Sequence, residues 1–247
     1  QLVELVENVT QRGSPVMANR VRAFLSKLFN WAVDRCILEV SPATRLPANK
    51  EIERTRVLSD VELKSFWLAI DSLSNPVHQA AVRVLLLTGQ RRSEVAQMAH
   101  GELDGKWWTI PAARAKNGVA HRVPLNAISC KYLSGKDGWV FPSQTANHLH
   151  PDTLSDLVHG AVGLAGISNC TAHDLRRTVG TFIQKEFGSE IMHKVLNHTE
   201  DKLTRVYGQY DFDKEKRLAL EGWARHLEMV YSERKTADVI DFDSWRA

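Results

Sequence analysis

The sequence predicts a mainly α-helical fold with a small antiparallel β-sheet inserted between helices. Apolar residues recur at helical spacing through most of the 247 residues. The stretch 107–125 differs, because the β-like runs WWTI and HRVPL flank an Asn-Gly pair, a strong turn signal. The run WVF at 139–141 predicts a further strand. The sequence has no internal repeats or low-complexity tracts.

The composition is that of an ordinary globular protein, with 43% hydrophobic and 25% charged residues. No apolar run approaches the ~18–20 residues that span a bilayer, so we expect a soluble protein with no membrane partner. The three cysteines are widely spaced and form no CxxC pair, which predicts a reducing compartment and no cysteine-based zinc site. The net charge of +3 is compatible with a polyanionic partner.

The N-terminal part is predicted to be helical and to end in a linker. The chain opens with Gln inside an apparent helix, which suggests a piece excised from a longer protein. Residues 17–38 place apolar side chains at helical spacing, with basic side chains on the remaining surface. Residues 41–56 contain two prolines, many polar residues and no periodicity, a pattern typical of a linker.

Helical patterning returns from about residue 58. Ser59 and Glu62 form a capping-box pattern ahead of one amphipathic helix. Pro76 begins the next helix, whose apolar run ends at Leu87 and is followed by Gly89 as a helix stop. The segment RSEVAQM begins another helix. Beyond the sheet, helices are predicted at about 151–165, 171–187, 190–197, 200–209 and 212–231.

The motif TAHDLRRT at 171–178 combines a helix start with two groups that can bind an anion. Thr171 and Asp174 indicate the N-terminus of a helix. His173 and Arg176 then share one face near this end, where anions are favoured and a guanidinium can hold two phosphate oxygens. The alternative is a capped surface helix with solvated charges.

Three further positions are ambiguous when each is taken singly. In TGQRRSEV, Arg91 and Arg92 occupy a tight turn, either capped by Glu94 or holding a guanidinium at the floor of a cleft. Lys116 precedes the Asn-Gly turn, a reachable place for a functional cation but also a common place for surface lysines. His198 ends a helix, where most histidines are structural or solvated.

Two of the four tyrosines, in TRVYGQY, raise a separate question. Leu203, Val206, Tyr207 and Tyr210 fall on one helical stripe, so periodicity alone predicts both tyrosines as core residues. No metal site is predicted. Neither of the chain's nearby histidine pairs, His193/His198 and His148/His150, carries the spacing or acidic partners of such a site.

In succession, these motifs resemble the tyrosine recombinases, especially the integrases of phages and genomic islands. The matching stretches are LLLTGQRRSEV, KNG…HRVPL, TAHDLRRT, VLNHTED and VYGQYDFDKEKRLALEGWARHL. The resemblance covers about Leu58 to Leu227, and residues 17–42 resemble the last helix of the preceding core-binding domain, with an arm-binding domain expected upstream. It implies part of a core-binding domain at 1–48, a linker at 49–57, a catalytic domain at 58–230 and a C-terminal tail at 231–247.

The resemblance implies an enzyme, a site-specific DNA recombinase that integrates or excises a mobile element. Tyr207 would be the nucleophile and form a covalent 3′-phosphotyrosine, whereas Tyr210 would be a packing residue. Arg91 and Arg176 would clamp the non-bridging phosphate oxygens. No cofactor, metal or ATP is expected, because the covalent link stores the energy of the broken bond.

Proton transfer and phosphate binding are assigned by the same resemblance. His173 would accept the phenol's proton or hydrogen-bond the phosphate, and His198 would donate a further hydrogen bond. Lys116, on a mobile hairpin, would protonate the departing 5′ oxygen. Asn197 stands where a glycine usually precedes the histidine, and we expect it to keep the left-handed turn.

The implied partner is double-stranded DNA at attachment sites, bound mainly through phosphates. The family assembles as tetramers on DNA, and this chain could be a monomer off DNA. The resemblance leaves room for accessory DNA-bending proteins and implies a cytoplasmic, nucleoid-associated protein in a bacterial host. The apolar tail residues are expected to pack between protomers: Val239, Ile240, Phe242 and Trp245. The basic residues expected to contact DNA are Arg20, Lys27, Arg92, Arg114, Arg122 and Arg177.

Three alternatives remain open at this point. A type IB topoisomerase would use the same chemistry to relax supercoils. A DNA-binding regulator would use the scaffold without chemistry, against which the complete set of candidate residues argues. A metal-dependent nuclease would need a carboxylate cluster that the sequence lacks.

Overall fold

The computed structural model describes residues 1–133, 135–143, 147–198 and 210–232. The chain divides into two compact units, Gln1–Thr55 and Arg56–Ala247. The helix predicted at 200–209, with Tyr207, and the tail residues predicted to pack between protomers lie outside the described residues.

The first unit consists of two helices, α1 (Leu2–Gln11) and α2 (Pro15–Asp34), and the segment that follows them. Ala43 and Leu46, in the stretch that composition predicts as a linker, are buried in a small core with α1 and α2. The backbone N–H of Asn49 also donates to the Asn19 side chain at 2.8 Å. This part of the predicted linker is therefore packed onto the helices.

Helix α2 ends earlier than the prediction of 17–38, because its C-terminus is closed by a Schellman turn. Cys36 adopts a positive φ of 56°. The N–H of Ile37 donates to the Ala32 carbonyl and the N–H of Cys36 to the Val33 carbonyl, both at 2.9 Å. Glycine usually occupies this position, so the sequence offered no stop signal.

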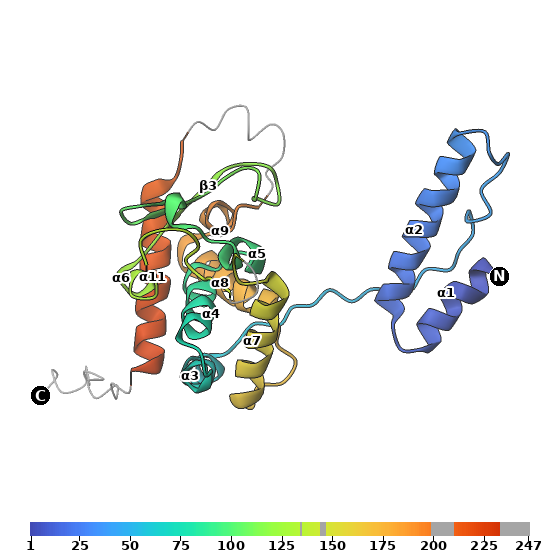
Figure 1. The fold of residues 1–247 in the computed structure, drawn as a ribbon. Helices are drawn as coiled ribbons and strands as arrows, with labels where there is room; N and C mark the ends of the chain where they lie inside the picture. The colour runs from blue at the N-terminus through green and yellow to red at the C-terminus, as the bar shows by residue number, and fades with distance from the viewer. Residues whose placement is uncertain (134, 144–146, 199–209, 233–247) are drawn as a thin grey trace, which may run out of the picture. The chain divides into compact units, whose positions relative to one another are not determined.

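The second unit is mainly helical with one three-stranded sheet, which confirms the predicted fold class (Figure 1). Its elements are α3 (Asp60–Ala69), η1 (Ile70–Ser72), α4 (Pro76–Thr88), α5 (Arg92–Ala96), η2 (His100–Glu102), β1 (Leu103–Asp104), β2 (Trp107–Ile110), β3 (His121–Pro124), α6 (Ala127–Cys130), α7 (Pro151–Leu164), α8 (Ala172–Phe187), α9 (Ser189–Val195) and α11 (Asp213–Tyr231). The predicted caps at Ser59, Pro76 and Gly89 are confirmed.

The sheet is antiparallel in the order β1-β2-β3, and Trp108 pairs with Val123 in its centre. Residues 111–120 connect β2 to β3, so the Asn-Gly pair lies within a longer loop rather than forming a two-residue hairpin turn. The predicted strand at 139–141 is wrong, since only Trp139 forms a bridge, to Ala99. The N–H of Val140 still donates to the Met98 carbonyl, but the Phe141 carbonyl accepts from Leu149, so the pairing does not extend into a strand.

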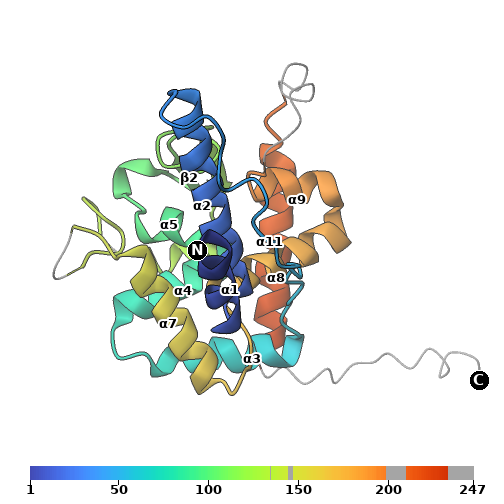
Figure 2. The same ribbon diagram turned by 90° about the vertical axis from the view of Figure 1, so that its right-hand side faces the viewer.

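Helices α4 and α8 lie in the middle of the second unit, between α7 and α11 (Figures 1 and 2). The second half of α4 is completely buried, and Trp223 of α11 donates its indole N–H to the Leu86 carbonyl at 2.9 Å. This packing brings the C-terminus of α4, the first turns of α8 and the C-terminus of α9 together. Leu196 and Asn197 follow α9 in non-helical conformations, so this helix is shorter than the predicted 190–197.

Gly89 is required at the C-terminus of α4 for two reasons. Its φ is 63°, and an added Cβ would lie 2.8 Å from Val179 Cγ1. We expect Gly89→Ala to lower the free energy of unfolding by about 2–4 kcal/mol, from left-handed strain and overpacking. Gly105→Ala is the matched control: φ there is 56° but no atom lies within 4 Å, so only about 1–2 kcal/mol should be lost. Urea unfolding measures both, and equal losses would contradict the packing argument.

Candidate active site at the C-terminal end of helix α9

Arg91 immediately precedes α5 and is held by the buried carboxylate of Glu94. The backbone N–H and Nη1 of Arg91 donate to the two Glu94 oxygens, each at 2.9 Å. The Nη2 group donates to the Asn197 carbonyl at 3.3 Å. The structure thus combines the two interpretations that the sequence left open, because Glu94 caps the turn while it orients a guanidinium that lines a cleft.

Arg176 lies in the second turn of α8 and is almost completely buried, with 4% of its surface exposed. Its Nη1 donates to the Gly89 carbonyl at 2.8 Å and its Nη2 to the Leu196 carbonyl. Burial, and secondly the charge of Arg91, lowers the Arg176 pKa to about 10. The guanidinium therefore remains charged at neutral pH, but with neutral carbonyl partners.

Backbone carbonyls at the C-terminal end of α9 and directly after it accept hydrogen bonds from the side chains of the site and so orient them. The Val195 carbonyl accepts from Gln90 and His121, each at 3.0 Å. The next two carbonyls, of Leu196 and Asn197, accept from Arg176 and Arg91 respectively. Carbonyls at a helix C-terminus carry partial negative charge and have no partner within the helix, so they are suited to hold cations.

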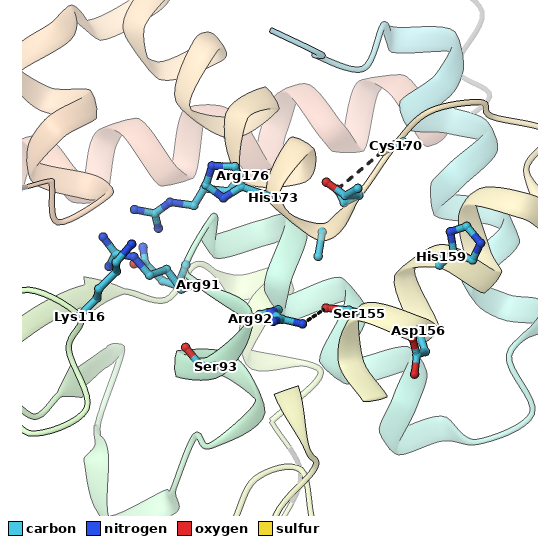
Figure 3. Close-up of a pocket in the computed structure, with 13 residues that line it drawn as sticks. Arg91, Arg92, Ser93, Lys116, Ser155, Asp156, His159, Cys170, His173 and Arg176 are labelled. Carbon is cyan, nitrogen blue, oxygen red and sulfur yellow. Dashed lines mark hydrogen bonds between the residues drawn. The ribbon is translucent and has the colours of Figure 1, made fainter. Parts of the chain in front are cut away.

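Four of the predicted catalytic residues, Arg91, Lys116, His173 and Arg176, line one cleft of about 540 Å³. Figure 3 shows the side chains of Arg91, Arg176 and Lys116 pointing toward the same part of this cleft. Together with Arg92, these give four cationic lining residues against one acidic residue, Asp156. The cleft is therefore suited to a polyanion.

His173 and His198 are shifted toward their neutral forms. The His173 pKa is lowered by partial burial and by the charges of Arg177 and Arg176. Partial burial and the charge of Arg176 lower the His198 pKa to about 4, and His198 Nδ1 lies 3.1 Å from Nδ1 of His193. His198 lines a second cleft of about 480 Å³ with Tyr210. Both histidines are thus neutral at pH 7 in the free protein and able to accept as well as donate.

The residues predicted to contact DNA lie on both units, and those of the second unit have acidic partners. Arg92 donates to Asp152 at 2.7 Å, as does Arg177 to Asp174 at 2.8 Å. Arg122 pairs with Asp213, and Arg114 is held by Glu102. In the first unit both predicted residues, Arg20 and Lys27, are exposed on α2, and Arg20 lies 3.7 Å from Glu51.

Sequence reasoning did not single out three polar residues that shape the site: the buried Gln90 and His121, and the half-buried Asn117. The first two bind the Val195 carbonyl and Asn117 binds Asn197. Their partners lie 74 to 105 residues away in the chain, so no local pattern marks them. Asn197 has a φ of 48°, which confirms the left-handed turn expected there.

His121 makes stability depend on pH. Burial, and secondly the charge of Lys216, lowers its pKa to about 3. Because the unfolded chain takes up a proton below about pH 6.5 and the folded chain does not, stability should fall on acidification, by about 2 kcal/mol at pH 5 from this group. The glutamine of His121→Gln does not titrate. The free energy of unfolding of this variant should therefore differ between pH 7.5 and pH 5 by about 2 kcal/mol less than that of wild type. An unchanged pH dependence would contradict the assignment.

Two properties of the described part of the chain bear on other classes of site. Among residues 1–133, 135–143, 147–198 and 210–232, no three His, Cys, Asp or Glu side chains gather where they could hold a metal ion. No helix in these ranges is long and apolar enough to cross a membrane.

The fold is that of solved phage integrases. A dimer of lambda integrase residues 75–356 bound to a COC′ core site superposes with a TM-score of 0.68 at 20% identity, over 82% of this chain and 79% of that chain. The integrase from mycobacterium phage Brujita gives a TM-score of 0.59 at 19% identity, over 92% and 83% of the two chains. These superpositions show that the chain has the fold of an integrase.

The sequence supports the same class. The model of the phage integrase family matches residues 56–214, and the chain belongs to this family. The prophage integrase IntF of Escherichia coli K12 is 30% identical over 61% of this chain and 34% of its own length. IntA of the same strain is 24% identical over 90% of this chain and 57% of its own length. The chain thus spans between about a third and somewhat over half of these relatives.

Proposed function

We propose that this chain is the catalytic part of a site-specific DNA recombinase that cleaves and rejoins strands through a covalent 3′-phosphotyrosine. The observation that carries the proposal is the pair of guanidinium groups, Arg91 and Arg176, oriented into one cationic cleft by the consecutive carbonyls of Leu196 and Asn197 that directly follow α9. Membership of the phage integrase family supports the same conclusion.

The geometry suits a phosphoryl transfer. Attack on a DNA phosphodiester gives a crowded phosphorus centre with added negative charge on its non-bridging oxygens. Two preoriented guanidinium groups favour this state over the ground state, and each such contact contributes ~2.7–4 kcal/mol. Since Arg176 and Arg91 are already bonded to protein carbonyls, little reorganisation is needed when the phosphate arrives.

We assign Tyr207 as the nucleophile. In the sequence it stands between His198 and Tyr210, which both line the second cleft. Tyr210 is the weaker candidate, because its hydroxyl donates to Glu215 at 2.9 Å and this bond raises its pKa. The expectation that Tyr210 is a packing residue is wrong, since it is 55% exposed.

The remaining groups transfer protons and bind the phosphate. His173, neutral before DNA binds, accepts the phenol's proton or a phosphate hydrogen bond, and His198 donates to the phosphate. Lys116 lies exposed at the cleft edge and protonates the departing 5′ oxygen. Rejoining runs the same steps in reverse, without ATP.

We propose that the chain acts as a tetramer on paired DNA sites, and that the first unit belongs to a core-binding domain joined to the catalytic domain by a short linker. Related solved structures include a lambda integrase tetramer bound to a Holliday junction. DNA contacts are assigned to basic residues of both units: Arg20, Lys27, Arg92, Arg114, Arg122 and Arg177. The proposal includes a cytoplasmic location on the nucleoid and leaves room for accessory DNA-bending proteins.

The test uses labelled duplexes that tile both ends of the mobile element encoding the chain, prepared as sets in which the nick is moved along the duplex. The full chain should give a protease-sensitive DNA adduct in EDTA, and should exchange strands between two different labelled duplexes. Relaxation of supercoiled plasmid at random positions without exchange would support the topoisomerase alternative. Cleavage that needs a divalent cation and leaves no adduct would overturn the proposal.

A further inference from the structure

The loop that carries Lys116 is fastened to the end of α9 by a pair of asparagines. Asn117 Nδ2 donates to Asn197 Oδ1 at 2.8 Å, and Asn197 Nδ2 donates back to Asn117 Oδ1 at 3.3 Å. Asn117 Nδ2 also lies 3.4 Å from the Asn197 carbonyl. A glycine at 197, which the family resemblance leads one to expect, would keep the turn and lose the reciprocal amide pair.

This pair lies between two groups of the proposed mechanism. Asn117 is the residue next to Lys116, and the carbonyl of Asn197 also accepts from Arg91 Nη2. Lys116 itself makes no hydrogen bond or ion pair with any residue that the structure describes, so its position depends on the loop backbone. Asn117 orders that backbone further by accepting from the N–H of Val119 at 3.2 Å.

We propose that Asn117 and Asn197 are positioning residues that hold the Lys116 loop over the cleft, so that the acid is in place when the phosphate is bound. The Asn197 carbonyl, which accepts from Arg91 Nη2, also lies 3.4 Å from Asn117 Nδ2, so one carbonyl contacts both the clamp arginine and the loop of the acid. This inference rests on the proposed function.

The step that the pair supports is expulsion of the leaving group. The Tyr207 oxygen forms a bond to phosphorus, the P–O5′ bond breaks, and its electron pair stays on O5′, which takes a proton from Lys116 Nζ. When sulfur replaces O5′, the P–S bond breaks and the pair leaves as a thiolate, which needs no proton. A variant whose defect is confined to the acid should therefore react at a normal rate on the sulfur substrate, whereas a variant with a general loss of structure should stay slow on it.

The experiment measures single-turnover rates of adduct formation. The substrate is the element-end duplex that the wild-type chain cleaves, prepared in two versions that carry either oxygen or sulfur at the 5′ position of the scissile phosphate. Asn197→Gly keeps the left-handed turn and removes only the amide. Asn117→Ala removes the other partner, and the double variant tests whether the two losses are shared. Lys116→Ala is the reference for a missing acid, and Ala113→Ser, exposed in the same loop, is the matched control.

We expect both asparagine variants to form the adduct about 10- to 100-fold more slowly on the oxygen substrate. This is part of the ~10²–10⁴-fold rate increase that a positioned general acid typically contributes. On the sulfur substrate they should come within about threefold of wild type, like Lys116→Ala, and the double variant should be no slower than the slower single one. Ala113→Ser should match wild type on both.

Three outcomes would overturn the inference. Wild-type rates for Asn197→Gly and Asn117→Ala on the oxygen substrate would show that the pair positions nothing. Equal slowing on both substrates would indicate a structural role only. If sulfur fails to rescue Lys116→Ala, the acid assignment and the asparagine pair both fall, although adduct formation by wild type still supports the recombinase. If wild type forms no adduct with either duplex, the proposed function itself fails.

Discussion

Tyr207→Phe is expected to form no covalent DNA adduct, because the phenylalanine ring carries no oxygen to attack phosphorus. DNA binding should be preserved, since the clamp residues and the basic residues of both units are unchanged. The measurement is a denaturing gel of the labelled, nicked element-end duplex beside a mobility shift of the same duplex.

Tyr210→Phe is the matched control for this prediction. It removes a hydroxyl that is exposed and bonded to Glu215, so adduct formation should stay within about threefold of wild type, the effect of losing one exposed hydrogen bond. An adduct retained in Tyr207→Phe and lost in Tyr210→Phe would reverse the assignment of the nucleophile.

Arg176→Lys is expected to slow adduct formation by about 10²–10³-fold, the typical effect of losing one preoriented donor to the developing charge. A lysine amine is a point charge and cannot bond the Gly89 and Leu196 carbonyls while it also presents two parallel donors to a phosphate. Saturating duplex should not restore the rate, because the lost interaction is made mainly in the transition state.

The control separates chemistry from folding. Arg83 is a second buried arginine, 5% exposed, which pairs with Asp71 and stacks on Trp67 away from the cleft. Arg83→Lys should lower the free energy of unfolding and leave the rate per folded molecule unchanged. If both lysine variants slow the reaction equally after correction for the folded fraction, Arg176 acts through stability and the clamp assignment is wrong.

Local signals in the sequence predicted much of the fold. Helix starts and stops depend on residues close together in the chain, so they can be recognised without knowing the tertiary structure. Examples are the capping pattern of Ser59 and Glu62, the proline at 76 and the glycine at 89. The end of α2 was missed because Cys36 takes the left-handed position that glycine normally marks. The strand at 139–141 was wrong, since an apolar run cannot reveal whether a partner is available.

The candidate site was predictable as a set of residue types in order, but its geometry was not. Arg91, His173 and Arg176 belong to recognisable motifs, whereas the carbonyls just after α9 that orient the arginines are backbone groups with no sequence signature. The pairing of Asn117 with Asn197 joins residues 80 positions apart. The exposure of Tyr210 also depends on tertiary structure, because helical periodicity describes only which residues share a face.

The most direct test of the central claim is to map the DNA-linked residue. After trypsin and nuclease digestion of the adduct, the peptide VYGQYDFDK, residues 206–214, contains both candidate tyrosines, so fragmentation by mass spectrometry distinguishes them. We predict a nucleotide attached through its 3′ phosphate to Tyr207. A nucleotide on Tyr210, on a residue outside this peptide, or joined through a 5′ phosphate would contradict the account.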